Sequence, residues 1–267
     1  MSLTPSSQYL AKCRELIDTV ESQQVEIDTA ANWFAASILA GRMVHLFGAG
    51  HSRIMVEEMW PRYGSFPGFN PIVELSLTFH NLVAGANGQR QAMFLETQTG
   101  LAERILRNFD LSDEDAALVI SSSGCNTVPI EMAELFQQRG IKVVAIVSRQ
   151  HSDASQSNHP AGVKLTDAAD LVLDTGAPIG DAMVTIEGLE TPVAPGSTVG
   201  GCMLVNTIKA EVAARLVEHG IPPRVLTAGC IVGGDRAKEL FESAYDEHAR
   251  RMAKLFENVG TSRNSKV

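Results

Sequence analysis

The sequence has no apolar run near the roughly 18 residues that a membrane-spanning helix needs. It also has no excess of positive charge, because 22 Lys and Arg stand against 31 Asp and Glu, a net charge of −9. A dedicated nucleic-acid binder, or a protein held on anionic lipid, needs a basic face. We therefore expect neither nucleic acid nor a membrane as a partner. The first residues show no basic segment followed by an apolar one, so we expect no secretory signal.

Cysteine is scarce, and the four cysteines are far apart with no Cys-x-x-Cys pair. This spacing fits reduced thiols in a cytoplasmic protein better than a disulfide framework. The seven histidines form neither a His-x-x-x-His nor a His-Glu-x-x-His pattern, so we expect no metal site. The sequence gives no sign of a cofactor, and we expect none.

The 267 residues have a globular composition, with 45% hydrophobic and 20% charged residues. Five short runs are rich in Val, Ile and Leu with little polar alternation, which is typical of strands buried on both faces. They span 43–47, 71–75, 116–120, 142–147 and 170–173, with helical segments between them at 52–63, 94–108 and 127–139. This alternation predicts an α/β fold, a three-layer α/β/α sandwich around a mostly parallel five-stranded sheet of flavodoxin-like strand order.

The first forty residues predict a helical extension. Between 6 and 40, apolar residues recur at alternating gaps of three and four, with one polar interruption at Gln24. The pattern fits one long helix or a helical hairpin broken near Ser22, and Gly41 is a suitable terminating residue. Such a segment either covers one side of the domain or also joins subunits.

After the fifth apolar run the pattern changes. Residues 182–194 predict a small antiparallel hairpin at a sheet edge. Two long helices follow, at about 198–219 with Ser197 or Thr198 as cap, and at about 235–257 with Asp235 as cap. We therefore divide the chain into a helical extension at 1–42, a binding domain at 43–230, and a C-terminal helix with a polar tail at 231–267.

The first candidate motif is Gly-Ala-Gly-His-Ser at 48–52, directly after the first strand and opening a helix. Glycines there let the backbone approach an anion, so we expect Gly50, His51 and Ser52 to bind one. Arg53 replaces the third glycine of a dinucleotide fingerprint, and Ile54 replaces the last glycine of a hydrolase nucleophile elbow. The alternative is a tight turn with a serine cap.

The second motif is Ser-Ser-Ser-Gly-Cys-Asn-Thr at 121–127, between the third strand and a helix. It lies where open α/β sheets bind ligands, and hydroxyls with backbone N–H groups can hold a tetrahedral anion. No Gly-Lys-Ser/Thr follows, so it is not a nucleotide P-loop. We expect Ser121, Ser122, Ser123, Asn126 and Thr127 to bind the anion; the alternative is a serine-rich turn with a helix cap.

Together, Gly-x-Gly-x-Ser after the first strand and Ser-x-Ser-Gly after a later one resemble the SIS (sugar isomerase) domain family. The resemblance covers roughly 40–230, and the stretch 123–133 looks most like an uncharacterised bacterial branch of phosphosugar isomerases. The resemblance implies that the serines of the second motif bind a sugar phosphate. Many members carry Ser or Thr where Asn126 stands, and an amide also donates hydrogen bonds, so phosphate or another anion fits.

Aldose–ketose isomerisation needs a base beside the substrate carbonyl and a donor for the enediolate oxygen. The resemblance implies a glutamate from the helix at 52–63, or from a neighbouring subunit, as base, and spacing does not rank Glu57 against Glu58. It also implies a role for His80, which follows the second strand as a histidine does in arabinose-5-phosphate isomerases. Glu96 is a further candidate, and His51 could help open the sugar ring. Glutamates on a solvated helix face are the alternative.

We therefore expect a sugar-phosphate isomerase that assembles as a homodimer or homotetramer. Two other readings stay open. SIS domains also serve as sugar-phosphate-binding regulators, although no separate basic helix-turn-helix region is visible here. The same carbon-acid step also serves lyases and etherases of phosphorylated amino sugars.

Overall fold

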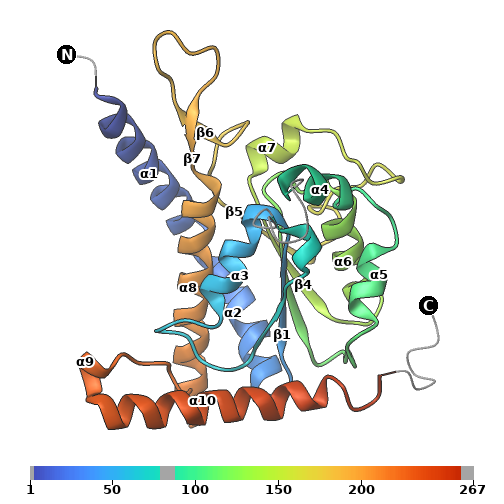
Figure 1. The fold of residues 1–267 in the computed structure, drawn as a ribbon, viewed down its shortest axis with the longest axis vertical. Coiled ribbons are helices and arrows are strands. Elements are labelled where there is room, and N and C mark those ends of the chain that lie inside the picture. Colours follow the sequence, from blue (N-terminus) through green and yellow to red (C-terminus); the bar gives the residue numbers. More distant parts are fainter. Residues whose placement is uncertain (1–2, 79–87, 260–267) are drawn as a thin grey trace.

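The computed structural model describes residues 3–78 and 88–259, which form a parallel five-stranded sheet between two helical layers (Figure 1). Its strand order is β2-β1-β3-β4-β5, which is the flavodoxin-like order. The strands are β1 (Val44–Gly48), β2 (Phe69–Ile72), β3 (Ala116–Ile120), β4 (Lys142–Val147) and β5 (Leu171–Asp174). The predicted α/β/α sandwich is therefore confirmed, and every pairing in the sheet is parallel.

The two faces of the sheet carry separate apolar layers. Alternate strand residues such as Leu118 pack on one side against α2 (Gln24–Leu39), α3 (Arg53–Met59) and α8 (Ser197–Glu218). Their neighbours, such as Val119, pack on the other side against α5 (Leu101–Leu106) and α6 (Thr127–Gln137). Both sets are buried, as expected for a parallel sheet covered on both faces.

The remaining elements surround this sandwich. The 3₁₀ helices η1 (Gly50–Ser52) and η2 (Leu75–Leu77), with α4 (Gly88–Leu95) and α7 (Arg149–Ala154), follow strands β1, β2 and β4. The short helix α9 (Gly229–Val232) leads into α10 (Gly234–Lys254), which crosses the end of the sandwich far from the hairpin (Figure 1). No described helix is both long and apolar enough to cross a bilayer.

The N-terminal segment is two helices, α1 (Pro5–Glu21) and α2, with the break at the predicted place. Gln23 explains the break, because its side chain accepts from the Asp174 N–H and donates to the Asp174 carbonyl. This pairing ties the end of β5 to the junction. The helices do not fold back into a hairpin, since α2 runs on in the same general direction as α1 (Figure 1). The proposed division of the chain at residues 42 and 230 stays a prediction.

The predicted hairpin forms β6 (Ala182–Val184) and β7 (Val193–Pro195), which pair antiparallel. Its predicted place at a sheet edge is wrong, because among the described strands these two pair only with each other and form a separate sheet. Together with α1 and the first turns of α8 it makes an arm that projects from the sandwich (Figure 1). A small apolar cluster holds the arm together, with Leu16 of α1 buried beside Met183 and Val184 of β6.

Three of the differences between predicted and observed boundaries have a clear local reason. The second strand ends at Ile72, and the Glu74 side chain accepts from the Ser76 N–H to start η2. The helix predicted at 52–63 ends at Met59, because Pro61 restricts the residue before it and supplies no N–H. The helix predicted at 94–108 is two helices, since Gly100 adopts a left-handed φ of 81° between them.

A buried carboxylate joins the starts of β1 and β3. Asp115 accepts two hydrogen bonds from the Arg42 guanidinium, at 2.9 and 2.8 Å, and its Oδ2 lies 3.2 Å from His45 Nε2. His45 in turn contacts Asn70 of β2 at 3.0 Å. Burial alone would raise the pKa of Asp115, but the contacts with His45 and Arg42 lower it to about 2.

We predict that Asp115→Asn lowers the free energy of unfolding at pH 7 by about 3 kcal/mol, because a pKa depressed by roughly two units is worth that much. The folded pKa lies below the unfolded one, so this stabilisation is present above about pH 5 and fades as the pH falls toward 2. Denaturant unfolding at several pH values measures it. Glu114→Gln, at the exposed neighbour, is the control. A difference between Asp115→Asn and wild type that persists unchanged at pH 2 would contradict this assignment.

Candidate functional site

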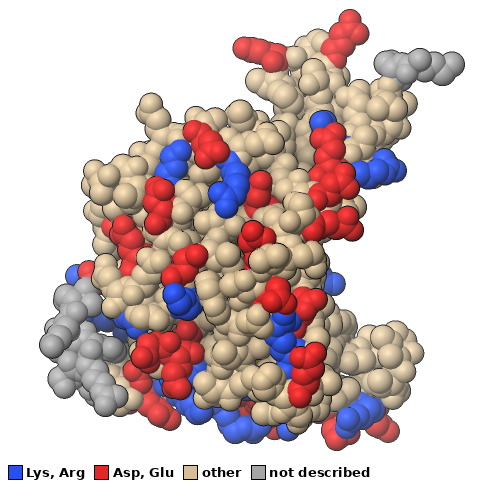
Figure 2. Space-filling model, turned by 180° about the vertical axis from the view of Figure 1, so that it is seen from behind, with Lys and Arg blue, Asp and Glu red and all other residues tan. Residues whose placement is uncertain are grey.

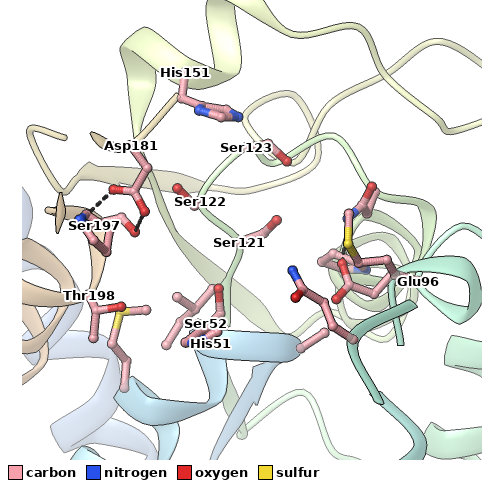
Figure 3. A pocket seen from close by; sticks show the side chains of 18 of the residues that line it. His51, Ser52, Glu96, Ser121, Ser122, Ser123, His151, Asp181, Ser197 and Thr198 are labelled. Carbon is pink, nitrogen blue, oxygen red and sulfur yellow. Dashed lines mark hydrogen bonds between the residues drawn. The ribbon is translucent and has the colours of Figure 1, made fainter. Parts of the chain in front are cut away.

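A pocket of about 580 Å³ lies at the carboxyl ends of the central strands (Figure 3). It is lined by the loop after β1, the loop after β3, parts of α4 and α7, and the start of α8. Ligands of open α/β sheets bind at this edge, where helix N-termini and loops converge. We call residues 48–52 the glycine loop and residues 121–123 the serine loop.

The glycine loop reverses the chain tightly after β1. A side chain at Gly48 would put its Cβ 2.7 Å from the Ser52 carbonyl oxygen, and Gly50 has a left-handed φ of 56°. Both positions therefore require glycine. The turn brings His51 and Ser52 to the pocket wall (Figure 3).

The serine loop offers hydroxyl groups toward the pocket. Ser121 Oγ accepts from the Gly124 N–H at 3.2 Å, and Ser123 Oγ accepts from the Cys125 N–H at 3.3 Å. Each of these hydroxyls keeps its hydrogen for another acceptor. Ser122 Oγ is buried and has no hydrogen-bond partner among the described residues. A buried polar atom of this kind calls for a ligand or a water molecule.

One carboxylate in the pocket wall is nearly buried. Glu96, which follows α4, is 8% exposed, and its Oε2 accepts a hydrogen bond from Asn126 Nδ2. Asn158 donates to the other end of the Asn126 amide at 2.9 Å, which fixes the amide orientation. Burial raises the pKa of Glu96, and the hydrogen bond from Asn126 offsets only part of that rise.

A second carboxylate caps the helix that closes the pocket. Asp181 Oδ1 accepts from the Gly196 and Ser197 N–H groups at 3.0 and 2.7 Å, and Oδ2 accepts from Ser197 Oγ at 2.8 Å (Figure 3). The expected cap by Ser197 or Thr198 is therefore wrong, because Asp181 reaches the N-terminus of α8 from another segment. Its negative charge is favourable there.

The start of α8 approaches its neighbours more closely than side chains would permit. A Cβ on Gly200 would lie 2.1 Å from the Thr175 carbonyl oxygen, and one on Gly201 would lie 1.9 Å from Met55 Sδ. These two glycines let α8 pack against the end of β5 and against α3. As a result, Ser197 and Thr198 reach the pocket.

Comparison with known proteins identifies the family. The family model described as SIS domain matches residues 8–148, more than half of the chain. This chain belongs to the SIS domain family. Its relatives include the UPF0309 protein of Geobacillus kaustophilus, 33% identical over 90% of this chain and 94% of that protein. The UPF0309 protein of Halalkalibacterium halodurans is 31% identical over 92% of this chain and 96% of its own length.

A solved structure shares the SIS fold. The phosphoheptose isomerase from Francisella tularensis superposes with a TM-score of 0.50 at 15% sequence identity, over 78% of this chain and 95% of that one. At this identity the likeness shows the fold alone. The family model, rather than this structure, confirms the resemblance predicted from the two loop motifs.

Most of the predicted binding residues of this SIS domain meet in the pocket. His51, Ser52, the serine loop and Asn126 all line it. Gly50 is buried inside the turn and does not line the pocket. Thr127 is also buried outside the lining, where its hydroxyl donates to the Asn158 carbonyl at 3.1 Å.

The predicted catalytic residues do not all lie at the pocket. Glu96 lines the pocket, whereas Glu57 and Glu58 do not. Glu57 is half exposed and lies 3.5 Å from the Arg53 side chain. Glu58 accepts hydrogen bonds from Arg62 and from Asn206 of α8. Burial alone would raise the pKa of Glu58, but these two donors lower it. His80 lies outside the described residues.

Sequence reasoning missed His151, Asp181, Ser197 and Thr198 as parts of the pocket wall. They come from α7, from the segment before β6 and from α8, and no spacing in the sequence links them. Within the described residues, no three His, Cys, Asp or Glu side chains gather as a metal site would require.

We predict that Ser122→Ala weakens binding of inorganic phosphate by about 5- to 30-fold, the equivalent of roughly 1–2 kcal/mol for a lost hydrogen bond to an anion. Isothermal titration of the purified protein measures this. Ser112→Ala, on a serine at the opposite edge of the sheet, is the control. Unchanged phosphate affinity in Ser122→Ala would show that the anion does not use the serine loop.

Proposed function

We propose that this chain interconverts the aldose and ketose forms of a phosphorylated, or otherwise anionic, sugar through an enediolate. The observation that carries the proposal is one nearly buried carboxylate, Glu96, in the wall of a pocket that also holds the serine loop (Figure 3). The serine loop would hold the anionic end of the sugar and position its carbonyl end near Glu96, where the reaction needs a base.

In the proposed reaction, the Glu96 carboxylate takes a proton from the carbon next to the carbonyl. The electron pair of the broken C–H bond forms the enediolate, and the same proton, or one from solvent, returns to the neighbouring carbon. The hydroxyl proton passes from the oxygen that becomes the new carbonyl to the oxygen that becomes the new hydroxyl. No electron acceptor is needed, because the sugar is oxidised at one carbon and reduced at the next. A carboxyl whose pKa is raised by burial suits this role, since its carboxylate is a stronger base.

The other pocket residues have complementary proposed roles. The serine loop would hold the anionic group of the sugar with hydroxyl and N–H donors. His51, from the glycine loop, would help open the sugar ring. Asp181 is a poor candidate for the base, because three donors at the start of α8 already occupy its carboxylate.

We predict that Glu96→Gln slows exchange of the hydrogen at C2 of the substrate with solvent by about 100-fold or more, the usual scale for loss of a general base. The experiment begins with a panel of sugar phosphates followed by NMR in deuterated water. Glu57→Gln and Glu58→Gln are the matched controls, and we expect both to exchange near the wild-type rate. Substrate affinity should change little in all three variants, because glutamine keeps the shape of glutamate.

The same panel separates the competing functions. An isomerase and an etherase both incorporate deuterium next to the carbonyl, but only the etherase releases a leaving group, and a sensor does neither. Binding without exchange for every sugar phosphate would therefore favour the regulator. Wild-type exchange in Glu96→Gln with loss in Glu57→Gln or Glu58→Gln would move the base to α3.

We also propose that the chain assembles as a homodimer or homotetramer through its projecting arm. Leu10 and Ile17 lie seven residues apart on α1 and are 57% and 43% exposed, while Leu16 and Val20 face inward. An exposed apolar stripe at heptad spacing is typical of a helix that packs against another. On the face shown in Figure 2, acidic and basic side chains are intermingled over the body of the molecule.

We predict that wild-type protein sediments as a dimer or tetramer at micromolar concentration. The double variant Leu10→Glu, Ile17→Glu should raise the dissociation constant by about 100-fold or more, since it buries charge in an apolar contact. Ile231→Glu, on the exposed α9, is the control and should leave assembly unchanged. A wild-type monomer at these concentrations would refute the proposal.

A further inference from the structure

His151 has no role in the function proposed above, although it lines the pocket. It belongs to α7, which follows β4, and its backbone N–H donates to the Ser148 hydroxyl at 3.3 Å. In Figure 3 its imidazole lies on the same side of the pocket as Ser123 and opposite His51 and Ser52. The side chain therefore stands beside the serine loop.

A backbone contact determines which ring nitrogen carries the proton. The Gly180 N–H donates to His151 Nδ1 at 2.9 Å. Because Nδ1 accepts this hydrogen bond, it has no hydrogen, and the proton of the neutral ring must be on Nε2. The side-chain hydrogen bond of His151 within the described residues is the one at Nδ1, and the residue is partly exposed in the pocket wall, so the Nε2–H is available to a ligand.

The segment that holds the ring is itself fixed at both ends. Near β5, Asp174 Oδ1 accepts from the Arg149 N–H at 3.0 Å, and the Ser148 hydroxyl donates to the Ala177 carbonyl at 2.6 Å. At the other end, Asp181 directly follows Gly180 and caps α8. The imidazole is thus oriented by a loop with little freedom, which favours a preorganised donor.

The lack of basic side chains in the described pocket lining makes a neutral N–H donor important for binding an anion. Among the described residues that line the pocket, none is Lys or Arg, while Glu96 and Asp181 are acidic. An anion bound here depends on N–H and O–H groups. The carboxylate of Asp181 at the start of α8 also disfavours an anion at that end.

We propose that His151 is a binding residue that donates Nε2–H to the anionic group held by the serine loop, while Gly180 fixes its tautomer. This inference rests on the proposed function and deepens it by naming a further anion ligand. The anion is thereby held by an oriented imidazole and by hydroxyls, from two neighbouring strand ends.

Two substitutions separate ligand binding from the contact with Gly180. His151→Asn places an amide oxygen near the position of Nδ1, so it can keep the contact with Gly180 but has no donor at the Nε2 position. His151→Gln places its amide nitrogen near the position of Nε2, so it keeps the donor but loses the contact with Gly180. We expect His151→Asn to weaken inorganic phosphate binding about 10-fold and His151→Gln to bind within about 3-fold of wild type.

Phosphate affinity in His151→Asn equal to wild type would overturn the proposal, and so would weaker binding in His151→Gln than in His151→Asn. A readout independent of affinity is ¹⁵N NMR of the imidazole in the ligand-free wild type at neutral pH. We expect an unprotonated Nδ1 and a protonated Nε2. A proton on Nδ1 would overturn the tautomer assignment.

Failure of this inference is distinguishable from failure of the proposed function. If Ser122→Ala weakens phosphate binding and Glu96→Gln stops exchange while His151→Asn binds normally, only the role of His151 is wrong. If Glu96→Gln exchanges at the wild-type rate while His151→Asn still loses phosphate, the anion site stands and the assignment of the base fails.

Discussion

The close approach of α8 to the end of the sheet is the constraint on which the pocket depends. Gly200 leaves no room for a Cβ against the Thr175 backbone, and Gly201 packs against the Met55 side chain, so α8 begins directly beside the carboxyl ends of the strands. Asp181 caps the helix at that point and thereby fixes the segment between β5 and β6. His151 is oriented by the same segment through Gly180. The close approach at Gly200, the Asp181 cap and the Gly180 contact together position this wall of the pocket.

The polar groups of the pocket suit two functions, anion binding and proton transfer. The serine loop supplies hydroxyls, including one that is buried without a partner among the described residues, and this suits an anion. Glu96 supplies a carboxylate whose burial raises its pKa, and this suits proton transfer at carbon. The remaining carboxylate, Asp181, is saturated by donors of α8 and so has a structural role in the free protein.

Much of the fold could be predicted from the sequence, because buried parallel strands appear as short apolar runs and glycine or serine motifs mark their ends. β3 and β4 begin and end where the apolar runs do. The ends of two helices were predicted less well. Pro61 ends α3 earlier than predicted, and Gly100 in its left-handed conformation divides the helix predicted at 94–108. The choice among Glu57, Glu58 and Glu96 could not be made from spacing. It depends on how α3 and α4 turn relative to the pocket, and that is a tertiary property.

The capping of α8 was also beyond sequence reasoning, because the donor and acceptor groups are fifteen residues apart with a hairpin between them. A local rule assigns the cap to the nearest hydroxyl, Ser197. In the fold, the carboxylate of Asp181 takes that place, and Ser197 becomes one of its donors. The contact between His151 and Gly180 likewise joins two strand ends that only the sheet order brings together.

The most direct test of the central claim is a crystal structure with a bound sugar phosphate from the exchange panel. The account predicts the phosphate on the serine loop, with hydrogen bonds from its hydroxyls, and the carbon next to the carbonyl about 3–3.5 Å from a Glu96 oxygen. A phosphate bound at another edge of the molecule, or a sugar whose carbonyl end points away from Glu96, would contradict it.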